Sequence, residues 1–378
     1  MKRRSFMVVL AAGGAVVALP GCNSMPASAI AAWQQPGADQ TDPRLRALSW
    51  ALLAPNPHNL QSWIADIREP GLIRLSVDLH RLLPETDPPN RQILIGCGAF
   101  LEMLCMAAAQ LGQRAEVTLL PEGEYAASGV DARPFATVRM TADATVQPDP
   151  LFAAVPLRRT NRAPYSAQVP SDALLAQLQS AAQRPGITLH AAADPAKVGR
   201  LRELAIAGYR VEFGTPATWS ESVNVMRVGT AAVATEPSGV PVLGTMVWWG
   251  EKLGMLDLAS LRKTDGVAAK TAVDTSVDAA QNTHAWAWLI SADNSRRSQI
   301  EAGRAYLRTD LAAASLGLAI QPNSQVLQEF PEMAELYSSF HKEVTVTQPS
   351  RVQMFVRLGY ASRPDPAPRR PLNRLVRA

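Results

Sequence analysis

The hydrophobic and polar positions along the chain predict short strands alternating with longer helices. Strand-length apolar runs occur at residues 63–67, 72–77, 117–120, 136–140, 285–291 and 352–359. Helical patterns occur at residues 42–53, 98–112, 171–182, 195–213 and 298–316. The presence of both kinds of element in one chain favours an α+β fold, in which helices pack on a mixed or antiparallel sheet.

Two of these helices carry the same sequence pattern. Residues 98–112 read GAFLEMLCMAAAQLG, and residues 303–317 read GRAYLRTDLAAASLG. At a constant offset, two glycines, an alanine triplet and a leucine coincide, and both stretches end in Leu-Gly, which is typical of a helix with a glycine C-cap. The match predicts an internal duplication and a pseudo-dimer of two half-units, at residues 40–150 and 151–378.

The net charge of +4 is concentrated at the two ends of the chain. Lys2, Arg3 and Arg4 supply part of it, and the arginines from Arg363 onward supply the rest, so the body between them is net acidic. A nucleic-acid-binding face needs basic residues clustered on the folded body. We therefore predict that the chain does not bind nucleic acid.

The first residues have the pattern of an export signal. Residues 2–7 read KRRSFM, a twin-arginine pattern, and a short apolar stretch follows as far as Leu19. That stretch is shorter than the roughly 20 apolar residues that a membrane-spanning helix requires. We expect residues 1–29 to direct export by the twin-arginine route, which carries folded proteins, to the periplasm or to a membrane-anchored lipoprotein form.

Two processing sites compete in this segment. Leu19-Pro20-Gly21-Cys22 resembles a lipoprotein box, in which Cys22 would be lipidated and become the new N-terminus. Ala27-Ser28-Ala29 is the alternative, a small-x-small site for ordinary signal peptidase. Residues 23–40 are small and polar, and we expect them to form a tether. The only membrane attachment that we expect is an N-terminal lipid anchor.

Cys105 lies within the first repeat helix and Cys97 directly precedes its repeated part, so we expect both remaining cysteines on one helix. Eight residues at the rise of an α-helix separate them by about 12 Å, beyond the roughly 7 Å that a disulfide allows. We expect buried free thiols. The five histidines show neither zinc-type spacing nor a Ser-His-Asp motif, so we predict no metal and no protein nucleophile.

Two short polar segments carry the candidate chemistry. Arg158-Arg159-Thr160-Asn161-Arg162 concentrates guanidinium groups, whose forks match phosphate oxygens, and Thr160 adds a hydroxyl donor. A solvated basic turn is the alternative interpretation of this segment. Asn56-Pro57-His58-Asn59 comes earlier in the chain and is followed by Gln61 and Trp63.

Together these segments resemble the flavin site of the nitroreductase family. Ordinary members carry the arginine-rich segment first and the Asn/Gln/Trp loop later, whereas the order is reversed here. The reversal is similar to the Acg-like branch, in which two half-units are fused, and the resemblance covers roughly residues 40–378. It implies a nitroreductase-like sandwich that binds one FMN per chain.

The resemblance assigns cofactor-binding roles to several groups of residues. It gives the FMN phosphate and ribityl chain to Arg158, Arg159, Thr160 and Arg162. It gives the flavin ring to Asn56, Pro57, Asn59 and Gln61. It gives backbone N–H groups near flavin N5 to the loop of Pro322, Asn323, Ser324 and Gln325. Asn90 is either a flavin contact or an ordinary helix cap, and Arg369 and Arg370 either close over the phosphate or form a loose basic tail.

Two departures from the family pattern weaken the predicted ring contacts. The family's Ser-Ser is replaced by Asn56-Pro57, and its Gln-Pro-Trp is replaced by Gln61-Ser62-Trp63. Residues 219–265 lack a long regular period, and we interpret them as a cover over the active face that holds Trp248 and Trp249. Simple core aromatics are the alternative interpretation of these two tryptophans.

The resemblance implies an exported FMN-dependent oxidoreductase that reduces nitroaromatic or quinone-like small molecules by two electrons. FMN would carry this chemistry, without a catalytic side chain. Cytoplasmic relatives take hydride from NAD(P)H, whereas an exported protein would need a quinol or a redox partner as electron donor. The alternatives are a protein that binds flavin without turnover and a scaffold without flavin. Because both parts of the site lie in one chain, a monomer should suffice for flavin binding.

Overall fold

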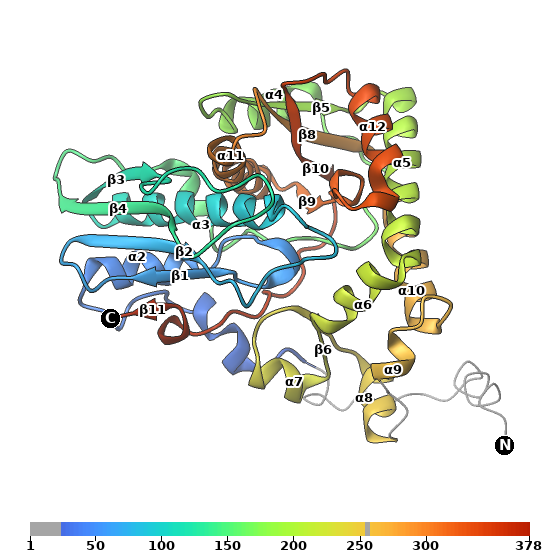
Figure 1. Ribbon diagram of the computed structural model, residues 1–378, viewed down its shortest axis with the longest axis horizontal. Helices are drawn as coiled ribbons and strands as arrows, with labels where there is room; N and C mark the ends of the chain where they lie inside the picture. Colours follow the sequence, from blue (N-terminus) through green and yellow to red (C-terminus); the bar gives the residue numbers. More distant parts are fainter. Residues whose placement is uncertain (1–23, 254–257) are drawn as a thin grey trace.

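The computed structural model, which describes residues 24–253 and 258–378, contains two sheets that each pack on a central helix (Figure 1). The two central helices pack against each other, so the layers run sheet, helix, helix, sheet. The twin-arginine pattern, its apolar stretch and Cys22 lie outside the described residues. This architecture confirms the predicted α+β fold with helices on a mixed or antiparallel sheet.

The first half is a sheet with helices on one face. It contains α2 (Pro43–Ala51), β1 (Trp63–Asp66), β2 (Leu72–Val77), α3 (Arg91–Gln110), β3 (Gln113–Leu119) and β4 (Pro134–Ala142). Its strands pair antiparallel in the order β1-β2-β4-β3. At the edge, β11 (Val376–Arg377) from the far end of the chain pairs with β1 in parallel.

The second half repeats this pairing pattern. It contains α4 (Asp172–Ala181), β5 (Ile187–Ala192), β8 (Ala285–Ser291), α11 (Arg296–Ser315), β9 (Ala319–Pro322) and β10 (Arg351–Gly359). Its strands pair antiparallel in the order β5-β8-β10-β9, so β5, β8, β10 and β9 correspond to β1, β2, β4 and β3. A further helix, α12 (Ala334–Glu343), lies between β9 and β10 in the chain.

The repeated glycines mark the crossing of the two central helices. A Cβ atom on Gly98 would lie 3.0 Å from the Cα of Gly303, and one on Gly303 would lie 2.9 Å from the Cα of Gly98. Each would also collide with a carbonyl oxygen, that of Ile300 and that of Ile95 respectively. Ile95 and Ile300 have the same offset as the glycines, so the contact is reciprocal, as in a two-fold interface. The predicted fused-half arrangement is confirmed by this contact.

The apolar composition of α3 follows from its burial. By length and hydropathy this helix would fit a membrane span, but 83% of its apolar window is buried inside the protein. It is therefore the core helix of the first half. Cys97 and Cys105 both lie on α3 as free thiols, and the expected burial holds for Cys97, whereas Cys105 is partly exposed.

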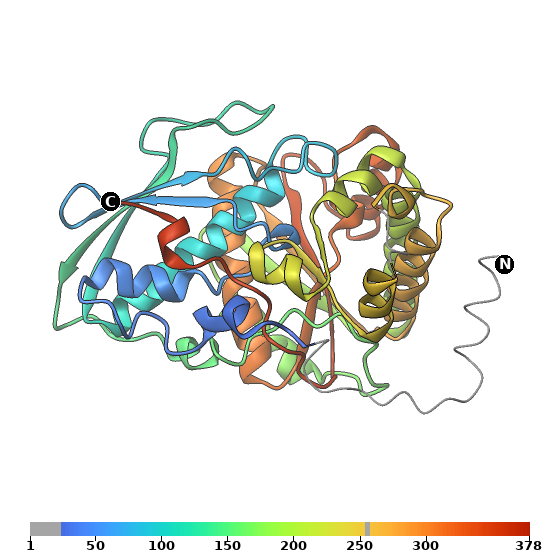
Figure 2. The same ribbon diagram turned by 90° about the horizontal axis from the view of Figure 1, so that it is seen from below.

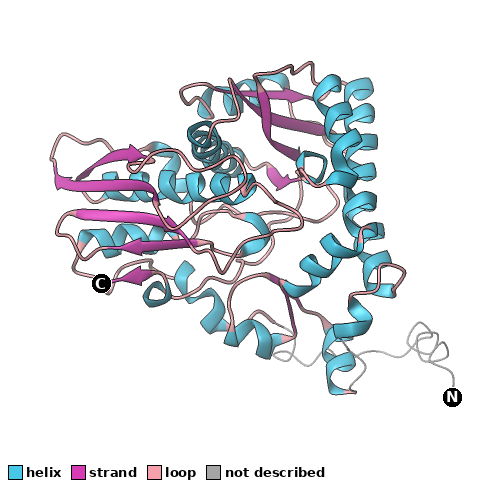
Figure 3. Ribbon diagram, in the orientation of Figure 1, coloured by secondary structure: helices cyan, strands magenta, loops and turns pink. Residues whose placement is uncertain are grey.

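The second half contains a long insertion that the first half lacks. A tight turn joins β1 to β2, whereas the segment between β5 and β8 comprises α5 (Pro195–Gly214), α6 (Pro216–Asn224), β6 (Met226–Val228), α7 (Thr230–Thr235), β7 (Val240–Val242), α8 (Thr245–Lys252), α9 (Leu258–Leu261) and α10 (Val267–Gln281). Figure 3 shows that this segment is mostly helical. In Figure 2 its yellow part, around α7, reaches the first half. We call residues 216–281 the cover.

The segment expected to be a tether is folded from residue 27 onward. Residues Ala27–Trp33 form the 3-10 helix η1, and Ala29 is fully buried. The Arg369 N–H donates to the Ala29 carbonyl at 2.8 Å, and the Trp33 Nε1–H donates to the Ala367 carbonyl at 2.8 Å. The prediction failed because the partner segment lies more than 300 residues away in the chain.

Candidate functional site

The structure brings the arginine-rich segment to the edge of the second sheet. Thr160 pairs with Ile320 of β9 in a parallel bridge, and the Asn161 N–H donates to the Ile320 carbonyl at 2.9 Å. The loop after β9 begins immediately beyond this bridge. The two segments predicted to bind phosphate and flavin N5, Arg158–Arg162 and Pro322–Gln325, are therefore neighbours in the fold.

Arg158 is held in place by an ion pair with Asp310 of α11. Its Nη1 lies 3.0 Å from Asp310 Oδ2, and both side chains are almost fully buried. Burial raises the pKa of Asp310, while Arg158 lowers it. Among the described residues, Arg158 Nε and Asp310 Oδ1 have no hydrogen-bond partner. The pair therefore fixes the guanidinium and leaves one of its edges available.

Three guanidinium groups surround the indole of Trp33. The guanidinium carbon lies 4.4 Å from the ring centroid for Arg159, 5.4 Å for Arg369 and 5.6 Å for Arg158. Burial, and after it the charge of Arg158, lowers the pKa of Arg159 to about 10. Burial and the charges of neighbouring arginines also lower the pKa of Arg369. This arginine cluster contains one paired buried carboxylate, Asp310, so an anion placed against it would be strongly stabilised.

Arg162 and His58 come from different halves and influence each other electrostatically. The Arg162 residue as a whole is exposed to solvent. Its guanidinium, however, has protein groups on several sides, so desolvation is the main cause that lowers its pKa. Burial and then the charge of Arg162 lower the pKa of His58 to about 4. His58 is therefore a neutral imidazole near pH 7, and it faces the arginine-rich segment.

The loop that carries His58 has an unusual backbone. His58, Asn59 and Gln61 all have positive φ, at 45°, 55° and 57°. Each such non-glycine conformation costs about 1 kcal/mol or more, and strain of this kind occurs often at functional sites. The Asn56 carboxamide closes the turn by accepting the Gln61 N–H at 2.8 Å. The close approach of Pro57 to Gly96 sets the loop against α3.

Asn59 and Gln61 hold neighbouring segments within the protein. Asn59 Nδ2 donates to the carbonyls of Gly239 at 3.1 Å and Pro368 at 3.0 Å. Gln61 is fully buried, donates to the Pro237 carbonyl at 3.0 Å and accepts the Arg370 N–H at 2.8 Å. These contacts give no support to the prediction that the two side chains touch a cofactor. They join the cover and the C-terminal segment to the loop.

The two C-terminal arginines are not a loose tail, and they point in different directions. The Arg369 guanidinium donates to the carbonyls at the end of α2, at 2.6 Å for Leu52 and 3.2 Å for both Leu53 and Ala54. The N–H groups of Arg369 therefore satisfy backbone carbonyls at the C-terminal end of α2. Its positive charge at the same time lies beside those of Arg158 and Arg159. Arg370 instead donates to the Gln61 carbonyl at 3.3 Å, away from the cluster.

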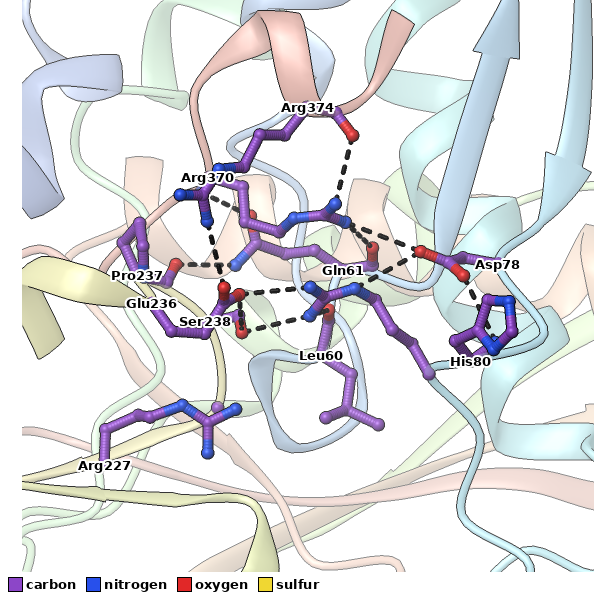
Figure 4. A network of polar contacts seen from close by, with 12 residues as sticks. Leu60, Gln61, Asp78, His80, Arg227, Glu236, Pro237, Ser238, Arg370 and Arg374 are labelled. Atoms are coloured by element: carbon purple, nitrogen blue, oxygen red, sulfur yellow. Dashed lines mark hydrogen bonds and ion pairs between the residues drawn. The ribbon is translucent and has the colours of Figure 1, made fainter. Parts of the chain in front are cut away.

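Arg370 belongs to a separate polar network that the sequence did not reveal (Figure 4). Arg81 donates to Glu236 at 3.1 Å and to Ser238 at 3.1 Å, and it lies 3.3 Å from Asp78. Arg374 lies 3.0 Å from the second oxygen of Glu236. The network joins the first half, the cover and the C-terminal segment. It therefore holds residues 236–238 of the cover in place against the first half.

The end of β9, the loop after it and the neighbouring helix α11 carry several buried polar atoms without partners in the described part of the chain. Among the described residues these include Gln321 Oε1, Asn323 Nδ2, Gln325 Oε1 and the hydroxyl of Tyr306. Asn323 is held by Tyr209, whose hydroxyl donates to its Oδ1 at 2.6 Å, and its backbone N–H is used by the Phe355 carbonyl. Pro322 has no N–H to present. Ser324 and Gln325, at the start of the 3-10 helix η4 (Gln325–Leu327), remain candidates.

Of the two roles predicted for Asn90, the structure contradicts that of an ordinary helix cap. It occupies the position before α3 with positive φ, but its side chain does not cap the helix. Its Oδ1 accepts the Val130 N–H at 3.1 Å. Asp87 is the residue that caps α3, accepting from the N–H groups of Gln92 and Ile93. The prediction erred because a carboxylate three residues earlier reaches the same helix end.

Sequence reasoning missed Trp33, His58, Tyr306 and Asp310 as members of this region. Asp310 offered one signal, since it is an acid within the second repeat helix next to Leu311 and an alanine triplet. An acid on a buried helical face requires a partner, and Arg158 is that partner. Trp33 offered none, because its segment reads as small and polar.

The sequence is similar over most of its length to two curated proteins of Mycobacterium tuberculosis (strain ATCC 25618 / H37Rv). It is 27% identical over 343 residues to "Putative NAD(P)H nitroreductase acg", covering 88% of this chain and 95% of that protein. It is 25% identical over 342 residues to "Putative NAD(P)H nitroreductase Rv3131", covering 87% and 89% respectively. No protein-family model matches the chain. These relatives support the resemblance to the nitroreductase family.

Solved structures give a weaker likeness. The FMN and NADPH-dependent nitroreductase NfnB from sphigopyxis sp. strain HMH aligns with a TM-score of 0.37 and 14% identity, covering 60% of this chain and 98% of that one. Oxidised iodotyrosine deiodinase bound to FMN and 3-iodo-L-tyrosine aligns with a TM-score of 0.32 and 15% identity, covering 58% and 94%. Because these scores are low, we draw no functional conclusion from them.

Proposed function

We propose that this chain is an FMN-binding oxidoreductase of the Acg-like branch of the nitroreductase family. The site lies in the second half and is completed by the loop Asn56–Gln61 from the first half. One observation carries the proposal. The arginine cluster sets three guanidinium groups against one paired carboxylate, beside a loop in which the Asn323 Nδ2 and Gln325 Oε1 atoms lack partners within the described part of the chain.

These residues fit the chemistry of a flavin phosphate. A phosphate brings two negative charges and several acceptor oxygens, which match the unpartnered Nε atoms of Arg158 and Arg159. The Tyr306 hydroxyl and the Asn323 carboxamide offer polar contacts suited to a ribityl chain or ring edge. The first half shows no equivalent cluster among its described residues, so we infer one FMN per chain.

When bound, FMN would supply two-electron transfer, and the protein's part is to bind and orient it. Arg158, Arg159 and Arg162 would hold the phosphate end. The N–H groups of Ser324 and Gln325, at the start of η4, would lie near the ring. The cover, held by Arg81 and Glu236, would exclude water from the opposite side. We propose nitroaromatic or quinone-like small molecules as acceptors.

We further propose export by the twin-arginine route, with lipidation at Cys22. A noncovalent cofactor made in the cytoplasm must be enclosed before export, and a route that carries folded proteins meets that need. NAD(P)H, the donor in the names of the curated relatives, is not supplied outside the cytoplasm. The electron donor of an exported form would then be a quinol or a redox partner. We also propose that a monomer binds FMN.

The proposal is tested by flavin content. Protein purified with FMN present should be yellow and release flavin on denaturation. The double variant Arg159→Ala/Arg162→Ala should lose the flavin, because it removes two phosphate donors while leaving the Arg158–Asp310 pair intact. Arg74→Ala, which removes a half-exposed guanidinium in the first half, is the matched control. Colourless wild-type protein that cannot take up FMN would contradict the proposal.

A second function is distinguished by kinetics. The neutral His58 and the extensively held cover would also suit a protein that binds flavin without turnover. Stopped-flow reduction by NADPH or a quinol, followed by addition of a nitroaromatic acceptor, separates the two. Reduction and reoxidation support the enzyme. Bound flavin that no donor reduces supports the binding protein.

A further inference from the structure

The 3-10 helix η1 lies against the residues that we propose to bind the phosphate. Trp33 ends this helix, and its indole is fixed by the hydrogen bond from Nε1 to the Ala367 carbonyl. At the other end, the buried Ala29 accepts the Arg369 N–H. The helix is therefore held at both ends by the C-terminal segment.

We propose that residues 27–33 are a permanent part of the working protein and that Trp33 is a positioning residue for the phosphate-binding arginines. This inference rests on the proposed function for its ligand. It also decides between the two processing sites, because retention of this segment is incompatible with cleavage after Ala29.

The indole compensates for the crowding of positive charge. Burial is the main cause that lowers the pKa values of Arg159 and Arg369. The charge of Arg158 lowers both further, and Arg159 also lowers that of Arg369, as expected of like charges held together. The face of a tryptophan ring attracts guanidinium groups, by up to about 2 kcal/mol where water is excluded. Asp310 pairs with Arg158, and backbone carbonyls hold Arg159 and Arg369, but the ring is the contact that all three guanidinium groups share.

The ring also fixes the direction of the Arg159 fork. One amino group, Nη1, donates to the carbonyls of Pro156 at 3.1 Å and Arg158 at 2.7 Å. The guanidinium face lies 4.4 Å from the centroid of the Trp33 ring. In the described structure the Nε atom on another edge has no partner. An anion that approaches this edge therefore meets a preorganised donor.

The same contacts protect the alternative processing site. A signal peptidase must bind the residues before its cut in an accessible form. Ala27, Ser28 and Ala29 all lie in η1, and although Ala27 and Ser28 are exposed, Ala29, the residue directly before the cut, has no exposed surface. Cleavage there would separate these residues from Trp33 and remove the acceptor of the Arg369 N–H. In a protein exported after folding, processing must occur before Ala27.

The binding claim is tested by comparing FMN with riboflavin, which lacks the phosphate. Apo-protein is titrated with each, for the wild type and for Trp33→Ala, Trp33→Phe and the control Trp50→Ala. Trp50 contacts Phe152 in a tilted ring pair, whereas the three guanidinium groups of the arginine cluster lie over the ring of Trp33. Trp33→Ala should weaken FMN binding by about tenfold and leave riboflavin binding unchanged, and Trp33→Phe should restore most of the loss.

Each outcome has a distinct meaning. An unchanged ratio of FMN to riboflavin affinity in Trp33→Ala would overturn the positioning role, since a purely structural role would weaken both ligands together. The same loss in Trp50→Ala would overturn it as well. Wild-type protein that binds neither ligand would contradict the proposed function instead.

The processing claim is tested without flavin. The full chain is expressed with its own leader, recovered from the cell envelope, and its N-terminus is determined by intact mass and peptide sequencing. We expect every mature form to contain residues 27–33. A mature form that begins at Ile30 and still binds FMN normally would overturn the inference while leaving the proposed function intact.

Discussion

The two halves share the same arrangement of strands and central helix, but only the second carries the residues of the proposed FMN site. Comparing equivalent positions therefore distinguishes residues that pack the two halves together from residues that form the site. Arg91 and Arg296, which have the repeat offset, both reach across to the opposite half. Arg91 donates to the Gln353 carbonyl at 3.2 Å, and Arg296 donates to the Pro89 carbonyl at 2.7 Å. At the same offset, however, Asp310 corresponds to Cys105 and Tyr306 to Leu101. Within the described residues, the two halves therefore share this packing, whereas the arginine cluster occurs once.

The largest expected loss of unfolding free energy comes from the crossing of the two central helices, which both halves share. Gly98→Val or Gly303→Val would place side-chain atoms into the backbone of the opposite helix, and either should cost about 3 kcal/mol or more of unfolding free energy. Chemical denaturation measures this cost. Gly199→Ala is the control, since a Cβ there meets no described atom within 4 Å and should not destabilise. Equal behaviour of all three variants would refute the reciprocal crossing.

The second-largest loss of unfolding free energy should come from the Arg158–Asp310 pair, which occurs in the second half and has no equivalent among the described residues of the first. Asp310→Asn would leave Arg158 buried without its counter-charge and should lower the unfolding free energy by about 3 kcal/mol. Cys105→Ala, the equivalent position in the first half, should cost about 1 kcal/mol. Adding inorganic phosphate should recover part of the loss in Asp310→Asn only. Thermal unfolding with and without phosphate measures this, and recovery in both variants would remove the distinction between the halves.

A smaller effect is expected from pH at the loop that the first half contributes. The pKa of His58 falls from an ordinary 6.5 to about 4 in the folded protein, so the unfolded chain takes up a proton first as pH drops. Stability should therefore fall between pH 6.5 and 4, by at most about 3 kcal/mol, and His58 should contribute nothing above that range. His58→Asn, which tolerates positive φ, should flatten the curve. Identical curves for both proteins would contradict a neutral His58.

The smallest effect on global stability should come from the cover. Glu236 is partly exposed, and Glu236→Gln weakens its pairs with Arg81 and Arg374 at a cost below about 1 kcal/mol. Local opening should respond more than global unfolding, because the network holds a short part of the cover, residues 236–238. Limited proteolysis should cut faster within residues 240–281. A variant with unchanged proteolysis and flavin release would show that other contacts hold the cover.

Elements with a strong apolar period were predictable from sequence, and half-exposed or long-range features were not. The strand Ala285–Ser291 is predicted at its observed bounds because nearly all its residues are buried. β3 begins at Gln113, before the predicted 117, because it alternates exposed and half-buried residues at a sheet edge. The cover was read as irregular, although short helices build most of it.

The candidate site divides in the same way. The arginine-rich segment and the loop after β9 are adjacent, as the resemblance implied, because a strand bridge joins them. The parts played by Gln61, Arg369 and Arg370 depend on segments about 300 residues apart that share no local pattern. The position of Trp33 beside the arginine cluster likewise depends on a distant segment of the chain, so the sequence alone did not predict it. Its importance follows only from what surrounds it in the folded chain.

Flavin stoichiometry tests the central claim most directly. Protein saturated with FMN and freed of excess is denatured, and released FMN is measured against chain concentration while sedimentation reports the assembly state. We predict about one FMN per chain, retained by the monomer and lost in Arg159→Ala/Arg162→Ala. A ratio of two per chain, flavin bound only to a dimer, or full occupancy in that variant would contradict a single site built from both halves of one chain.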